Sequence, residues 1–169
     1  NTTDSHAVLL GSNKTFDVHN VASYINTAGR IYAQSGVVIK STGGGKSFLL
    51  RPLSDSDAFG VGDGVTTGPR VSNAFLAAFD GSLGTVEVGY ATTQSGTITI
   101  NDGDGTDATP ITLAEALTIQ AASAAVNVVL MRSTQKASSP RVNDLMCCLM
   151  KAASKNGTCL LNTVVMTSV

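Results

Sequence analysis

The spacing of apolar residues along the chain predicts three helices. The strongest helical pattern covers 139–157, where apolar side chains recur three and four residues apart and Gly157 supplies the C-terminal end. A second helix is predicted over 17–29, with Asp17 as its N-cap. A third pattern, over 110–125, has capping-box spacing, although its β-branched residues leave a strand as an alternative.

Alternating apolar and polar residues predict strands between these helices. The segments TVEVGY and GTITIN alternate strictly, as half-buried antiparallel strands do. Further strand candidates are 30–34, 37–40, 47–51, 73–79, 126–132 and 158–166. The elements together predict an α+β fold, a single β-rich domain over 1–169 with antiparallel strands and two or three helices.

Two segments have no regular pattern. Residues 1–15 are expected to form a tail. Residues 54–70 are rich in Gly and Asp over a length at which loops without structure of their own are uncommon. We expect this segment to be an extended loop or arm that becomes ordered against a partner.

The stretch STGGGKS, Ser41–Ser47, ends like a phosphate-binding P-loop. A P-loop needs a glycine where Lys40 stands, and it needs a helix directly after the motif, which Pro52 prevents. A Gly-rich turn between two strands is therefore favoured over a nucleotide site.

The stretch NDGDGTD is the one candidate for a metal site. Asp102, Asp104 and Asp107 offer alternate carboxylates, as a calcium loop does. An EF-hand would place Gly at the position of Asp107 and Glu at that of Leu113, so an ordinary turn is the favoured interpretation. No cofactor is expected.

Catalytic signatures are not found in the sequence. It has no G-x-S-x-G elbow and no H-E-x-x-H motif, and its two histidines, His6 and His19, lie far from the three cysteines near the end. We therefore expect that the protein is not an enzyme. The cysteines lack a disulfide framework and indicate thiols made in a cytosol. No apolar run approaches the roughly 20 residues of a membrane span, so no membrane contact is expected.

Charge is scarce and unevenly distributed. Charged residues make up 14% of the chain with a net charge of -1, and acidic residues gather in the middle while basic residues flank them. The charges either pair within one fold or join the acidic patch of one copy to the basic patch of the next. The second interpretation gives an interface of Asp55, Asp57, Asp63, Arg132, Lys136, Arg141 and Lys151. Sparse basic residues and few aromatics argue against direct nucleic-acid contact.

Low charge, abundant Ser, Thr, Gly and Ala, a β-rich pattern and an arm-like loop together resemble the structural proteins of tailed-phage particles. These are capsid decoration or cement proteins and tail-tube subunits. The resemblance implies a non-enzymatic virion subunit, assembled in the host cytoplasm, that forms a homo-oligomer or binds a viral shell or tail protein. Two alternatives are an NTP-binding protein that uses Ser41–Ser47 and a surface adhesin or fibre module with a calcium loop.

Overall fold

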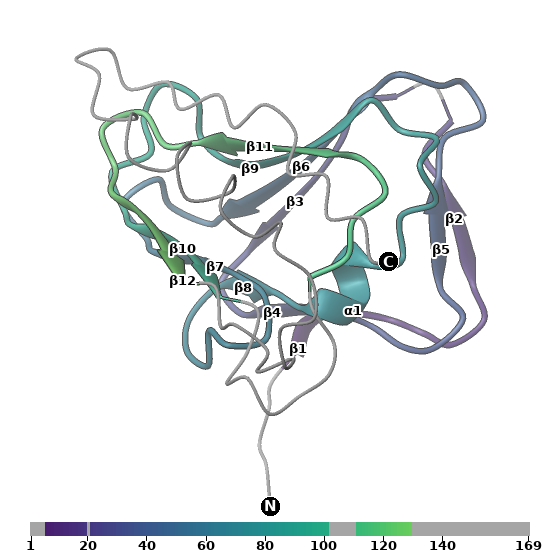
Figure 1. Ribbon diagram of the computed structural model, residues 1–169, viewed down its shortest axis with the longest axis horizontal. Helices are drawn as coiled ribbons and strands as arrows, with labels where there is room; N and C mark the ends of the chain where they lie inside the picture. The colour runs from purple at the N-terminus through teal and green to yellow at the C-terminus, as the bar shows by residue number, and fades with distance from the viewer. Residues whose placement is uncertain (1–5, 20, 102–110, 130–169) are drawn as a thin grey trace, which may run out of the picture.

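A computed structural model describes residues 6–19, 21–101 and 111–129, and these residues form a stack of short parallel strands (Figure 1). The elements are β1 His6–Leu10, β2 Thr15–Asp17, β3 Ser23–Thr27, β4 Arg30–Ala33, β5 Val38–Lys40, β6 Ser47–Pro52, β7 Phe59–Val61, β8 Arg70–Val71, α1 Asn73–Leu76, β9 Thr85–Gly89, β10 Ile98–Asn101, β11 Ala116–Gln120 and β12 Val126–Val129.

The strands form three sheets, and the chain visits them in turn. The first sheet has the order β1-β4-β8-β7-β10-β12, the second β11-β9-β6-β3 and the third β2-β5. The chain forms β1, β2 and β3, one in each sheet, and then β4, β5 and β6, again one in each sheet. Each strand of the second set pairs with a strand of the first: β4 with β1, β5 with β2 and β6 with β3. This arrangement is a parallel β-solenoid, in which each coil contacts its neighbours along one axis. We call residues 6–27, which hold β1 to β3, the first coil.

One insertion breaks the order of the coils. After β6 the chain forms β7, which lies beyond β8 in the first sheet and pairs with both β8 and β10. All three residues of β7 are buried. A Cβ on Gly60 would come within 2.5 Å of the Val65 side chain, so glycine lets the returning loop pack closely. The segment 54–70, expected as an arm, thus contributes a buried strand.

Columns of apolar side chains run through the interior along the solenoid axis. In the first sheet, register pairing aligns Val8, Ile31, Val71, Val61, Ile100 and Val128. The four inner members are buried, whereas the two end members are only partly buried. A second column aligns Ile25, Leu50, Val88 and Ile119. The interior is therefore complete in the middle coils and partly open at the first coil, whereas at the other end Val128 is partly buried and Ile119 is buried.

The predicted α+β fold with antiparallel strands and two or three helices is wrong. Every strand pair of the described residues is parallel, and α1 is the one helix among them. Parallel sheets are usually buried on both faces and lack alternation. In a solenoid, however, each sheet has one face in the core and one in solvent, so its parallel strands alternate like antiparallel ones.

The predicted helix over 17–29 is also wrong. Asp17 ends β2, and β3 then pairs with β6 through Ser23 to Thr27. Pairing with a neighbouring coil overrides a helical spacing carried by β-branched residues. The strand alternative for 110–125 is confirmed by β11, whereas the predicted helix over 139–157 and the strand over 158–166 lie outside the described residues.

The predicted strand over 73–79 contains α1 instead. The hydroxyl of Ser72 accepts a hydrogen bond from the backbone N–H of Phe75 at 3.1 Å and caps the helix. Phe75 and Phe79 then turn inward and meet edge to face, with ring centroids 5.6 Å apart. The predicted tail over 1–15 holds β1 from His6 onward.

Candidate interaction surface at the first coil

The first coil is an end of the solenoid. β1 pairs with β4, β2 with β5 and β3 with β6, and among the described residues none of the three has a strand on its other side. A free strand edge presents N–H and C=O groups that can pair with another chain. The first coil therefore has open backbone edges in all three sheets.

Large exposed hydrophobic side chains gather on this coil. Among the described residues there are five: Leu9 (50% exposed), Phe16 (37%), Val21 (62%), Tyr24 (68%) and Leu53 (61%). Four of them belong to the first coil. Solenoids normally end in a coil with a polar outer face, so this concentration distinguishes the first coil as an interaction surface.

These side chains are exposed for two different reasons. Phe16 occupies the same interior position as Ile39 in the next coil, and Ile39 in turn bridges to Phe79. Phe16 thus has an interior position, but no coil formed by the described residues covers it on the other side. Tyr24 instead pairs with Leu49, at alternate positions from the buried Leu50, and so lies on the outer face. The surface thus contains both interior residues that are uncovered at the first coil, such as Phe16, and residues on the outer face of the sheet, such as Tyr24.

Two of the three edge strands, β1 and β3, lack the residues that usually block strand pairing. Natural edges carry Lys, Pro or inward charges, but β1 reads HAVLL and β3 reads SYINT, without any of these. The first coil contains one Lys and one Asp, Lys14 and Asp17, so its formal net charge is zero with neutral His. Neither the β1 and β3 edges nor the net charge of the first coil opposes contact at this end.

A polar corner fixes the first coil to the second. One carboxylate oxygen of Asp17 accepts hydrogen bonds from the backbone N–H groups of Thr42 at 3.1 Å and His19 at 2.8 Å. These donors, Thr42 foremost, lower the pKa of Asp17. The His19 ring contacts the Thr42 hydroxyl at 2.9 Å. The open coil is thus held in place by specific contacts with its neighbour.

The same corner continues along the solenoid to Glu115. A Glu115 carboxylate oxygen accepts a hydrogen bond from the backbone N–H of Gly81 at 2.7 Å. Burial raises the pKa of Glu115, and the nearby charge of Asp80 adds to that increase. No group of three or more His, Cys, Asp or Glu side chains within 6–19, 21–101 and 111–129 is placed to hold a metal ion.

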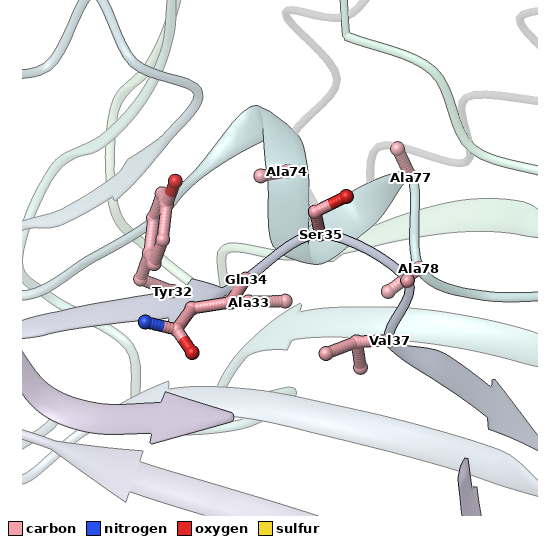
Figure 2. A pocket seen from close by; sticks show the side chains of 9 residues that line it. Tyr32, Ala33, Gln34, Ser35, Val37, Ala74, Ala77 and Ala78 are labelled. Carbon is pink, nitrogen blue, oxygen red and sulfur yellow. The ribbon is translucent and has the colours of Figure 1, made fainter. Parts of the chain in front are cut away.

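A shallow hollow of about 350 Å³ lies between α1 and the turn after β4 (Figure 2). Its lining comprises Tyr32, Ala33, Gln34, Ser35, Gly36, Val37, Ala74, Ala77 and Ala78. None of these side chains is charged, and the amide oxygen of Gln34 already accepts hydrogen bonds from the backbone and hydroxyl of Ser12, both at 3.0 Å. The lining combines the methyl groups of Ala and Val with the uncharged polar side chains of Tyr32, Gln34 and Ser35.

The acidic residues predicted for an interface are not gathered on the first coil. Asp63 forms an ion pair with Arg30 at 2.9 Å and accepts a hydrogen bond from the backbone N–H of Asn73 at 3.3 Å. Asp55 and Asp57 lie in the turn before β7, where their backbone carbonyls accept hydrogen bonds from the 94–96 turn. The other predicted interface residues, Arg132, Lys136, Arg141 and Lys151, and the calcium candidates Asp102, Asp104 and Asp107, lie outside the described residues.

The glycine-rich motif is a turn, as predicted. Residues 41–46 connect β5 to β6, and β6 begins at Ser47. A strand therefore stands where a P-loop requires the N-terminus of a helix. The backbone N–H of Ser41 donates to the Ser82 hydroxyl at 2.7 Å, which ties this turn to the next coil.

The first-coil surface was missed from the sequence because residues 1–15 were assigned to a tail and 17–29 to a helix. The available signals were the short apolar run AVLL before Gly11 and the strand-favouring residues Tyr24, Ile25 and Thr27 in SYINT.

No family model matches the chain, and searches of curated proteins and of solved structures give no match. Within the described ranges, no helix is long and apolar enough to cross a membrane.

Proposed function

We propose that this chain is a non-enzymatic structural subunit of a large assembly, and more narrowly a virion component of the decoration or tail type. It would bind other copies of itself or a shell or tail protein. The observation that supports the proposal most directly is the open first coil, where four of the five large exposed hydrophobic residues of the described part lie beside unpaired strand edges.

The low charge of the chain supports the same function. Charged residues are 14% of the sequence and the net charge is -1, so repulsion between copies is weak. The acidic and basic residues named from the sequence would then determine the register of the contact and the choice of partner more than the binding affinity. The reason is that exposed ion pairs contribute only about 0–1 kcal/mol each.

The proposal is tested by the native mass of the purified full chain. Light scattering over a range of concentrations should give masses that are multiples of the 17.2 kDa chain, and the association should persist without added nucleotide. A mass that stays at 17.2 kDa at every concentration contradicts binding between copies, which is the part of the proposal that the isolated chain can test. ATP or GTP binding that is lost in Lys46→Ala would instead support the NTP-binding alternative.

A second candidate is a fibre or surface adhesin module, which the solenoid itself favours. Stacked coils extend along one axis and give long lateral faces, as extended binding proteins require. Thermal unfolding with calcium and with a chelator tests the calcium loop in this candidate. A calcium-dependent rise in melting temperature that is lost when Asp102, Asp104 and Asp107 are all changed to Asn supports it, and an unchanged melting temperature argues against it.

A further inference from the structure

We propose that two copies of this chain bind each other end to end through their first coils. The two copies would be related by a two-fold axis at a right angle to the solenoid axis. This inference rests on the proposed function, because it names the surface by which one subunit binds another. It places the contact on residues 6–27 and not on the charged residues named from the sequence.

The core columns provide the first argument. Val8, Phe16 and Ile25 are interior residues of the first coil that are only partly buried or exposed. Their register partners in the second coil are Ile31, Ile39 and Leu50, which are at most 1% exposed. One more apolar layer would complete all three columns at once, and burial of apolar surface is the main favourable term in association.

The backbone provides the second argument. A two-fold axis across the solenoid reverses the direction in which the chain runs around each coil, so the edges of two first coils meet in the antiparallel sense. Antiparallel pairing of free edges satisfies the outward N–H and C=O groups of β1 and β3. Neither strand contains a Lys, Pro or acidic residue that would prevent it.

The partner is assigned as a second copy from the chemistry of the surface. A two-fold interface places the same patch on both sides, so the patch must be self-complementary. Here apolar residues face apolar residues, and the zero formal charge of residues 6–27 avoids repulsion between identical ends. The strands at the opposite end, β11 and β12, carry none of the five large exposed hydrophobic residues of the described part, so the contact is assigned to two first coils.

The test compares the full chain with three lysine variants. Val21→Lys and Tyr24→Lys place a cation on the first coil at residues that are 62% and 68% exposed, so the subunit fold should be retained. Leu53→Lys is the matched control, since Leu53 is 61% exposed and lies outside the first coil. Circular dichroism verifies the fold of each variant, and sedimentation velocity measures association over a concentration series.

We expect the wild-type chain to form dimers, and we expect Val21→Lys and Tyr24→Lys each to raise the concentration for half-association by about tenfold or more, because a two-fold interface receives every substitution twice. Leu53→Lys should associate like the wild type. If the wild type associates and the first-coil variants associate equally well, this inference is wrong while the proposed function stands. A wild-type chain that remains monomeric overturns this inference and, with it, the binding between copies in the proposed function, while binding to a shell or tail protein would still stand.

Discussion

Phe16 and Ile39 are register partners in β2 and β5, yet Phe16 is 37% exposed and Ile39 only 1%. The two side chains occupy the same interior position of consecutive coils. Ile39 lies between two coils, with Phe16 on one side and Phe79 on the other. Within the described part of the chain, Phe16 has a neighbouring coil on one side only, and this accounts for the difference. The same contrast defines the first coil as an open end.

This contrast predicts different outcomes for truncation at the two positions. Ile39→Ala should lower the free energy of unfolding by about 2–5 kcal/mol, because it leaves a cavity between coils. Phe16→Ala should cost less when unfolding is measured at concentrations below association, because its ring is already partly in water. Urea unfolding of both variants provides the comparison, and equal losses would contradict an open first coil.

Gln94 should stabilise the corner where three turns meet. It is fully buried, and its amide nitrogen donates hydrogen bonds to the carbonyls of Asp57 at 3.1 Å and Gly96 at 2.8 Å. Its amide oxygen has no partner in the structure. Gln94→Met removes both bonds and the unpaired acceptor together, so we expect a net loss of about 1–2 kcal/mol in unfolding free energy.

The control for this prediction is Gln34→Met. Gln34 is exposed and bonds to Ser12, so its loss should change the unfolding free energy by less than about 0.5 kcal/mol. Equal melting temperatures for the two variants would show that Gln94 does not hold the turns together.

Glu115 should make the protein less stable as pH rises. Burial raises the pKa of Glu115 above its ordinary value of 4.5. The protonated carboxyl therefore favours the folded state below pH 4.5, and this contribution is lost as pH increases through the raised pKa. Glu115→Gln keeps an oxygen that can accept the Gly81 N–H. The urea midpoint of Glu115→Gln minus that of the wild type should increase between pH 4 and pH 8. A difference that stays constant over this range would refute the assignment.

Asp17 should have the opposite pH dependence. Hydrogen bonds from the backbone of Thr42 and of His19 lower the pKa of Asp17 below its ordinary value of 3.8. The ionised carboxylate therefore stabilises the fold above pH 3.8, and this contribution is lost as pH falls through the lowered pKa. Asp17→Asn should melt at a lower temperature than wild type at pH 7, and the gap between them should narrow as pH falls below 3.8. A gap that widens with acid would contradict this account.

Local patterns predicted several strands correctly but not how they pair. The alternation in β9 and β10 marks one buried and one solvated face, and that pattern is identical for an antiparallel sheet and for one side of a solenoid. Strand direction depends on the path between strands. Nothing in residues 41–46, for example, distinguishes a hairpin turn from a corner that leads to another sheet.

The candidate surface could not be predicted from the sequence for a related reason. Phe16 and Ile39 are both apolar residues in short strands, and only the stacking order shows that one is at an end. The buried strand within 54–70 was hidden because Gly60 within β7 and Gly62 directly after it give this stretch the composition of a loop. Its pairing with β10 involves residues distant in sequence, which no local pattern encodes.

Amide hydrogen exchange on the full chain, measured below and above the concentration of association, tests the central claim most directly. The account predicts that amides of β1 and β3 become more protected at the higher concentration, because the free edges of the first coil become covered. Amides of the buried central strand β6 should be unchanged, and Tyr24→Lys should abolish the added protection. Association that protects other parts of the chain while β1 and β3 exchange at the same rate would contradict it.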